Sequence, residues 1–345
     1  MAGGPSFGGK RELLARGLLW SGVSFLLSQL AARDSLLVLN YHRIGNPHDD
    51  LFDPGVFSAT ADEFSDQIAH LKRHLSPVTL EEALAFATGR LKDKIRRCRV
   101  LITFDDGYLD NYTTAYPILR SLGVQGVFFL ATGMVGSCQV PWWDHIAYLV
   151  KTARRRSFTL HLPALLAVDL DRNGLGESLG AILKLYKMPE NTDPERFIRE
   201  LAEEARGEEL PGTLRRFLNW DEAREMIRGG MAIGSHTHSH HVLSQLEPQR
   251  QLEELSHSRV ILKEQLGIEA DALAYPVGRK VSFTVQTQML VRDAGYRAAF
   301  SSYGGTNMQG KTSAYNVKRT KMVGQSWSRF QVRTTVCRST GSYWP

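Results

Sequence analysis

Short apolar runs alternate with amphipathic segments along most of this 345-residue chain, and this alternation is the strongest constraint on its fold. Buried strands are predicted by the apolar runs at residues 35–41, 99–104, 126–132, 231–235, 270–275, 296–301 and 315–322. Helical spacing predicts helices over residues 61–74, 113–122, 220–228, 249–266 and 286–294. Another helix is predicted to open at Thr79, as its N-cap, with Glu82 three residues later as the capping-box partner. Strands that alternate with helices favour a parallel sheet with helices outside it. About seven such units favour a closed or nearly closed barrel over an open sheet.

Two regions depart from this rhythm. Residues 142–218 are charged and predict a largely helical insertion, with turn signals inside it. Residues 17–32 are uncharged and rich in leucine, and they follow Lys10, Arg11 and Arg16. This stretch is shorter than the ~20 apolar residues of a spanning helix. It leaves open a packing helix, an interfacial membrane helix and a signal anchor.

We therefore expect three parts: an N-terminal helix over residues 1–34, a main domain over 35–325 and a C-terminal tail over 326–345. No A-x-A pattern follows the apolar stretch, so a cleaved signal peptide is not expected. We expect a cytoplasmic or membrane-associated protein, with peripheral membrane contact through the N-terminal helix.

The positive charge of the chain is spread out rather than concentrated. The formal net charge is +6, and the densest basic run is the triplet at residues 154–156. No basic stretch is interleaved with aromatic residues in the way that nucleic-acid-binding segments are. We interpret the surplus as a solvated basic face and expect no nucleic-acid partner.

Three segments that suggest a functional site directly follow predicted strands. Asp105 and Asp106 follow the strand at 99–104, and the cluster that contains His236 and His240 follows the strand at 231–235. The segment at 275–278 follows the strand at 270–275. Because the carboxyl ends of parallel strands meet at one rim, we expect these three segments to converge there.

These residue types suit a mononuclear metal site. His236 and His240, four residues apart on one turn, can direct their ring nitrogens to a single ion, and Asp106 completes three protein ligands. A bound Zn²⁺ lowers the pKa of its water toward ~7. Asp105 is then free to take the proton of that water as general base. His238 and His241 are interpreted as structural or supporting residues.

The same segments resemble the first three motifs of the polysaccharide deacetylase family, the NodB-homology domain. These are Thr-Phe-Asp-Asp-Gly at 103–107, His-Thr-His-Ser-His at 236–240 and Tyr-Pro-Val-Gly at 275–278. The resemblance covers roughly residues 36–322 and implies a distorted (β/α)7-type barrel with a helical insertion. It also implies hydrolysis of an N-acetyl, less often O-acetyl, group of a sugar with one divalent metal ion, most often zinc. The substrate would be an acetylated glycan or a lipid-linked saccharide.

The resemblance also implies roles for single residues. Asp105 would be the base, and Asp106, His236 and His240 would be the metal ligands. The segment Tyr275, Pro276, Val277 and Gly278 would line the substrate, with the Val277 N–H stabilising the oxyanion.

Two departures from the family pattern concern the residues around the base. Many members carry an arginine in the third motif that orients the base, whereas Ala274 occupies that position here. Arg319 and Arg43 are candidates for the missing role. Many members also have a late histidine as general acid, and no histidine follows His257. His42, at the end of the first strand, resembles the early Tyr-His element of the exopolysaccharide-modifying branch, and we hypothesise that it is the acid.

Two other functions are also compatible with these residues. The same metal site would serve an amidohydrolase that acts on a non-sugar amide. The departures from the motif pattern also fit a carbohydrate-binding homologue that has lost catalysis. Trp142, Trp143 and Trp220 border the expected rim, where they serve either as core packing or as a platform for a sugar ring.

Overall fold

The computed structural model describes residues 9–21, 35–47, 50–92, 97–188, 190–210, 215–323 and 326–340. Its α-helices are α1 (Gly9–Trp20), α3 (Ala61–His74), α4 (Leu80–Ala87), α5 (Tyr116–Leu122), α6 (Trp142–Lys151), α7 (Leu170–Asn173), α8 (Leu175–Tyr186), α9 (Pro194–Ala205), α10 (Trp220–Arg228), α11 (Pro248–Leu266), α12 (Val285–Asp293) and α13 (Trp327–Thr340). Its strands are β1 (Ser35–Tyr41), β2 (Arg43–Ile44), β3 (Phe57–Ala59), β4 (Ser76–Pro77), β5 (Arg99–Phe104), β6 (Gly126–Leu130), β7 (Ser157–Leu160), β8 (Leu166–Asp169), β9 (Ala232–Ser235), β10 (Ala272–Ala274), β11 (Ala298–Phe300), β12 (Asn307–Met308) and β13 (Thr320–Lys321).

The main sheet is parallel along most of its length. Its central path runs β11-β10-β9-β6-β5-β1-β12, with β13 also paired to β1 and β4 paired to β5. Only the β1–β12 pair is antiparallel among these described strands. Every residue of β1, β5 and β6 is buried, as expected for strands covered on both faces.

The sheet curls back toward its own first strand. A parallel bridge joins Phe300 of β11 to Val317, and the chain from Val317 continues into β13 beside β1. The predicted distorted barrel is therefore confirmed. The last strand is much shorter than the predicted run at 315–322, because residues 314–316 form a 3₁₀ turn before β13.

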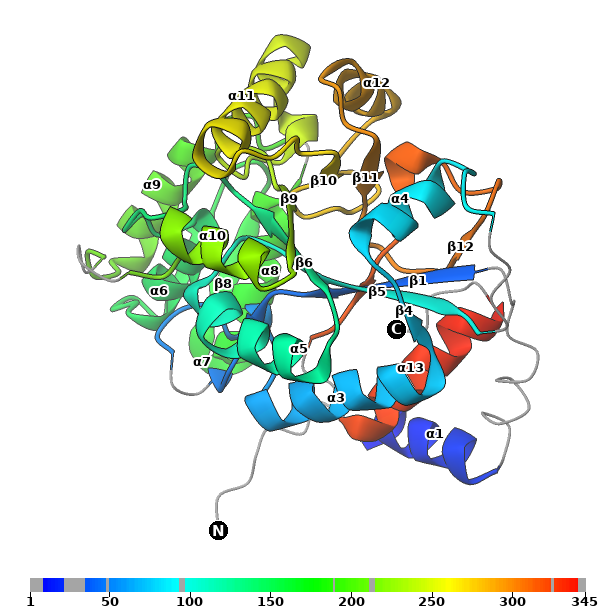
Figure 1. Ribbon diagram of the computed structural model, residues 1–345. Helices are drawn as coiled ribbons and strands as arrows, with labels where there is room; N and C mark the ends of the chain where they lie inside the picture. The colour runs from blue at the N-terminus through cyan, green and yellow to red at the C-terminus, as the bar shows by residue number, and fades with distance from the viewer. Residues whose placement is uncertain are drawn as a thin grey trace.

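Helices surround this sheet, as Figure 1 shows with α3 and α5 on one side and α11 and α12 on another. The predicted helix over 61–74 has the predicted bounds. The N-cap at Thr79 is also confirmed: its side chain accepts the N–H of Glu82, and the Glu82 side chain accepts the N–H of Thr79. Reciprocal capping of this kind satisfies two backbone donors that a helix start would leave unpaired.

The insertion forms a mainly helical lobe with its own apolar core. Helices α6, α7, α8 and α9 gather on one side of the molecule in Figure 1. The lobe also contains an antiparallel hairpin, β7–β8, that the largely helical prediction missed. Phe158, Leu160 and Val168 of this hairpin are buried in the same apolar cluster as Ile182 and Leu201. The lobe lies against the carboxyl ends of the sheet strands and supplies part of the cavity described below.

The two ends of the described chain lie side by side. Helix α13 packs against α1 and β1, and the blue and red helices are adjacent in Figure 1. The sequence predicted only a tail after residue 326, so α13 is a helix that the prediction missed. Most of the apolar stretch at 17–32 lies outside the described residues. Within the described part, no helix has the length and apolar character needed to cross a membrane.

Candidate metal centre

Asp105 and Asp106 directly follow β5, and their carboxylates face different partners. The Asp105 N–H still donates to the carbonyl of Tyr41, at 3.1 Å, so Asp105 continues the strand. Asp106 and Gly107 then have φ angles of 74° and 83°, in the left-handed region that a non-glycine residue rarely adopts. A Cβ on Gly107 would lie 2.8 Å from the Leu130 side chain, so this sharp turn also needs a glycine. The turn separates the two carboxylates.

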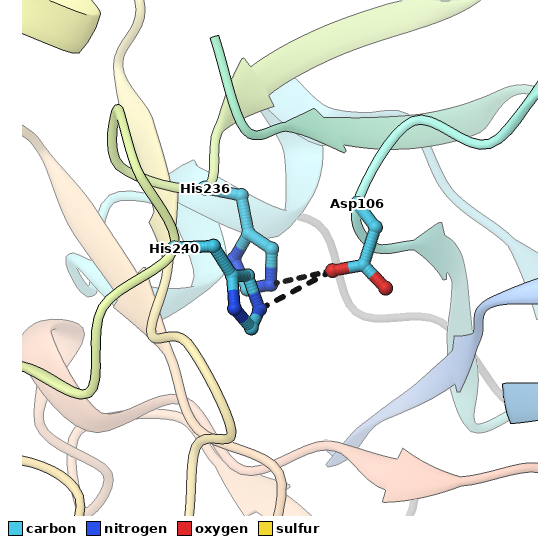
Figure 2. A group of neighbouring side chains, drawn as sticks. All are labelled: Asp106, His236 and His240. Carbon is cyan, nitrogen blue, oxygen red and sulfur yellow. Dashed lines mark ion pairs between the residues drawn. The ribbon is translucent and has the colours of Figure 1, made fainter. Parts of the chain in front are cut away.

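The turn places Asp106 against His236 and His240. Asp106 Oδ1 lies 3.4 Å from His236 Nε2 and 3.3 Å from His240 Nε2 (Figure 2). The three side chains are buried, and their potential ligand atoms all lie within 4.8 Å of one another. Asp106 Oδ1 is buried without a hydrogen-bond partner among the described residues. Two imidazole nitrogens and one carboxylate oxygen around a common point fit a zinc site that keeps a position open.

The backbone around the triad supports this geometry. His236 Nδ1 lies 2.7 Å from the carbonyl of Ala274, which holds the ring with Nε2 directed at Asp106. The segment from His236 to His240 forms an irregular loop rather than the expected single turn, with φ values of 65° at Thr237 and 57° at His240. Glu254 of α11 fixes this loop by accepting the N–H groups of residues 238 and 239 at 3.0 and 2.8 Å.

Arg319 holds the second carboxylate, Asp105. Its guanidinium donates to both Asp105 oxygens, at 2.6 and 2.7 Å, and Asn40 Nδ2 donates to Oδ2 at 3.0 Å. Burial raises the pKa of the Asp105 carboxyl, but the charge and hydrogen bonds of Arg319, together with the charges of His236 and His42, outweigh this effect and hold the pKa below its usual value. Asp105 is therefore ionised at neutral pH. The other candidate, Arg43, instead forms ion pairs with Asp50 and Asp110.

His42 reaches the same rim from the end of β1. It lines the cavity together with Asp105, Asp106 and the two triad histidines. Asn111 Nδ2 donates to the His42 carbonyl at 2.7 Å, and the His42 N–H donates to Ser58 Oγ at 3.0 Å. The ring atom Nδ1 is buried and has no hydrogen-bond partner among the described residues. Burial lowers the pKa of His42 to about 4.

The segment at 275–278 contributes its backbone more than its side chains. Of its four residues, only Val277 lines the cavity, and it does so with a φ of 63°. Tyr275 points into the core, where its ring stacks on Phe283 with 4.0 Å between centroids. Pro276 and Gly278 are buried, and a Cβ on Gly278 would lie 2.7 Å from the backbone nitrogen of Ser302. Of the four residues expected to line the substrate, the structure therefore places only Val277 in the cavity wall.

The triad opens into a cavity of about 410 Å³ between the sheet and the insertion. This volume lies in the range of small-molecule sites. Trp142 and Trp143 of α6 and five residues of α8 form the wall on the insertion side. Trp142 stacks on Tyr186 with 4.2 Å between centroids, so it both packs and faces the cavity. Trp220 packs against the main core instead and does not line the cavity.

A buried network behind Trp143 supports one of the triad histidines. The Trp143 ring meets His240 edge-on, with 4.5 Å between centroids, and its Nε1–H donates to the Tyr108 hydroxyl at 2.6 Å. That hydroxyl lies 3.3 Å from Asp144, which also pairs with Arg216 at 3.0 Å. Burial raises the pKa of Asp144 to about 7. Tyr108, Asp144 and Arg216 were missed at the sequence level because they lie outside every motif, whereas Trp143 was expected at the rim.

His238 and His241 lie outside the triad. His238 stacks on His257 with 4.3 Å between ring centroids, and its Nδ1 lies 3.0 Å from Thr132 Oγ1. Neither His238 nor His241 lines the cavity. Of the other residues missed from sequence, Asn40 carried a weak signal as a polar residue near the end of an apolar strand, and Glu254 carried none within a charged helix.

The amino-acid sequence of this chain is similar to those of several known proteins. Residues 92–299 match the family model described as polysaccharide deacetylase. A putative polysaccharide deacetylase, YxkH, of Bacillus subtilis is 23% identical over 206 residues, which cover 60% of this chain and 45% of that protein. A poly-beta-1,6-N-acetyl-D-glucosamine N-deacetylase of Staphylococcus epidermidis is 32% identical over 115 residues, which cover 30% of this chain and 39% of that protein. The chain thus spans less than half the length of either relative.

Solved structures share the fold over most of the chain. The Streptococcus pyogenes deacetylase PplD superposes with a TM-score of 0.57 at 18% identity, covering 88% of this chain and 99% of that one. IcaB from Ammonifex degensii superposes with a TM-score of 0.55 at 21% identity, covering 89% of this chain and 98% of that one. These superpositions show a shared fold.

Proposed function

Because the chain belongs to the polysaccharide deacetylase family, we propose that it is a metal-dependent hydrolase that removes N-acetyl groups from a carbohydrate. One observation carries this proposal: the triad of Asp106, His236 and His240 lies in the same cavity as the ionised carboxylate of Asp105. Three ligands and a separate base are the set that metal-assisted hydrolysis of an amide requires.

The ligand atoms favour zinc as the ion. Two imidazole nitrogens and one carboxylate are common ligands of catalytic zinc, whereas magnesium and calcium prefer oxygen ligands. A divalent ion at this triad supplies Lewis acidity and lowers the pKa of a water that shares the site. In this proposal the N–H of Val277, a residue of the cavity wall, donates to the oxygen of the acetyl group as charge develops there.

Asp105 acts as the general base. Its carboxylate is hydrogen-bonded by Arg319 and Asn40, whereas His236 Nε2 of the triad lies farther away, 3.9 Å from Oδ2. The carboxylate therefore stays available to take the proton of the attacking water. The bidentate contact fixes its orientation while its proton-accepting capacity is kept, because each carboxylate oxygen has more than one lone pair. We therefore assign Asp105 as the base and Asp106 as a metal ligand, because the two carboxylates have different partners.

His42 delivers a proton to the leaving nitrogen in this proposal. The lowered pKa of His42 makes the imidazole neutral at pH 7, so it must receive a proton before it can donate one. The proton that Asp105 removes from water during attack is available for this transfer. The buried Nδ1 of His42, which has no partner among the described residues, is the atom that we assign to this role.

Replacing His42 by Ala should reduce kcat by about 100-fold, the usual loss when one general acid is removed. The metal content should stay at the wild-type level, because His42 is not part of the triad. Steady-state acetate release and metal analysis of the same sample measure both. His161→Ala, at an exposed histidine that pairs with Glu200, is the matched control and should change neither. A kcat of the His42 variant within about twofold of wild type would exclude the role.

The relatives favour an N-acetylhexosamine as the sugar. The S. epidermidis relative is named for N-deacetylation of poly-beta-1,6-N-acetyl-D-glucosamine. Acetate release from N-acetylglucosamine oligomers, an O-acetylated sugar, a lipid-linked N-acetyl sugar and a simple non-sugar acetamide tests the proposal. We expect release from an N-acetyl sugar. Release only from the non-sugar acetamide would support an amidohydrolase, and sugar binding without any release would support a binding protein.

A further inference from the structure

Four cationic side chains line the cavity of the triad. Lys184 and Lys187 come from α8 and its C-terminal end, Arg279 from the loop after β10, and Lys321 from β13. We call these four residues the cationic wall. They come from three segments that are far apart in the sequence. The loop after β10 also contains Val277 of the cavity wall, and Arg319, the partner of Asp105, directly precedes β13. Lys187 and Lys321 are half-buried, whereas Lys184 and Arg279 are exposed at the cavity mouth.

The carboxylates of the cavity do not neutralise this wall. Three aspartates line the cavity, at positions 53, 105 and 106. Asp105 is committed to Arg319, and Asp106 belongs to the metal triad. Asp53 remains, and one of its oxygens accepts the N–H of Gly55 at 2.8 Å. Positive charge is therefore in excess inside the cavity, and a bound divalent ion would increase the excess.

Two members of the wall have no carboxylate partner. Within the described part of the chain, neither Lys187 nor Arg279 forms an ion pair. The Lys187 ammonium lies 5.4 Å from the centroid of the Trp142 ring, which is a contact but not a counter-charge. Burial lowers the pKa of Lys187 to about 7, and the neighbouring charges of Lys321 and Arg279 lower it as well, whereas the charges of Asp53 and Asp106 act in the opposite direction. Keeping cations together in a partly buried wall is costly unless an anion joins them.

We propose that the substrate is an anionic glycan, in which a phosphate or carboxylate group adjoins the N-acetylated sugar and binds Lys187, Arg279 and Lys321. This inference rests on the proposed function, because it places the acetamido group at the triad and the anion at the wall of the same cavity. Charge-assisted contacts to three cations would select acidic glycans over neutral ones. The exposed Lys184 at the mouth adds to the attraction of an anion from solution.

A matched pair of substrates tests this selection. Di-N-acetylchitobiose is neutral, and its 1-phosphate differs only by the anion; a third disaccharide, with glucuronate beside N-acetylglucosamine, carries a carboxylate. We expect kcat/KM to be at least about tenfold higher for one or both anionic substrates at low ionic strength, with the advantage falling as salt is added. A preference for the phosphate or for the glucuronate compound distinguishes the two sources of the anion.

Substitutions in the cationic wall test which residues produce the preference for anionic substrates. Lys187→Met and Arg279→Met should each lower the ratio of anionic to neutral kcat/KM by about tenfold, the loss of one charge-assisted contact. Lys280→Met is the matched control, because Lys280 adjoins Arg279 in sequence but does not line the cavity. Lys280 instead lies over the ring of Tyr303. Its variant should keep the wild-type ratio.

A binding measurement separates this inference from the proposed function. Calorimetric titration of the Asp105→Asn variant with each disaccharide reports affinity without turnover. Tighter binding of an anionic disaccharide supports the cationic wall even if no acetate is released by the wild type, a result that would contradict only the proposed function. Equal affinities, or equal kcat/KM values that the Lys187 and Arg279 variants leave unchanged, would overturn the inference while leaving deacetylation intact.

Discussion

Replacing Asp105 by Asn should lower acetate release by at least about 1,000-fold, the upper part of the range for loss of a general base. An amide keeps the size of the carboxylate but cannot accept the proton of the attacking water. The triad atoms belong to other residues, so the variant should bind the same amount of metal as the wild type. Metal analysis and acetate release on one preparation measure the two effects.

The matched control for this substitution is Asp271→Asn. Asp271 is half-buried and pairs with Arg297 at 3.0 Å, but it does not line the cavity. We expect this variant to retain full activity. If Asp105→Asn keeps more than about a tenth of the wild-type rate, Asp105 is not the base. If it loses metal together with activity, the separation of the base from the ligands is wrong.

Replacing Arg319 by Gln should impair both stability and catalysis. Arg319 is fully buried, and its bidentate contact is the main charge compensation of Asp105. Removing one partner of a buried ion pair costs about 3–5 kcal/mol in the free energy of unfolding. Without the guanidinium, burial would raise the pKa of Asp105, so the base would lose both its orientation and part of its ionisation. We expect kcat to fall by about 100-fold.

A double variant separates these two effects of Arg319. In Asp105→Asn/Arg319→Gln both charges are removed, so the free energy of unfolding should recover part of the loss, while activity should not return. Urea unfolding of the single and double variants measures this coupling. Arg297→Gln, in a more exposed pair with Glu81, is the control and should cost less than about 1 kcal/mol. Wild-type turnover in Arg319→Gln would show that Asp105 needs no such partner.

The sequence predicted the candidate site best where its residues directly follow the ends of strands. The segments that follow β5 and β9 bring Asp106, His236 and His240 together as predicted, because parallel strands end at one rim. The partner of Asp105 could only be narrowed to two arginines. Arg319 lies 214 residues from Asp105 in sequence, and it reaches the base only because the sheet curls until β13 pairs with β1. No local pattern encodes such closure.

Other features escaped prediction for different reasons. The hairpin β7–β8 is short, and a short strand in a charged segment gives little periodicity to detect. Helix α13 has no strong amphipathic pattern and was predicted as a tail. The cationic wall was also not visible from sequence, because Lys187, Arg279 and Lys321 meet only in the folded chain. Membrane contact through the N-terminal segment stays a prediction, since residues 22–34 lie outside the described part.

Metal-dependent deacetylation is the central claim, and one titration tests it most directly. The purified chain is stripped with a chelator and reloaded stepwise with Zn²⁺, while bound zinc and acetate release from an N-acetylglucosamine oligomer are measured together. We expect activity to disappear on stripping, to return in proportion to bound zinc and to saturate at one ion per chain, the capacity of the single triad among the described residues. His240→Ala should neither bind the ion tightly nor regain activity. Undiminished acetate release by the stripped protein, or by the His240 variant, would contradict the claim.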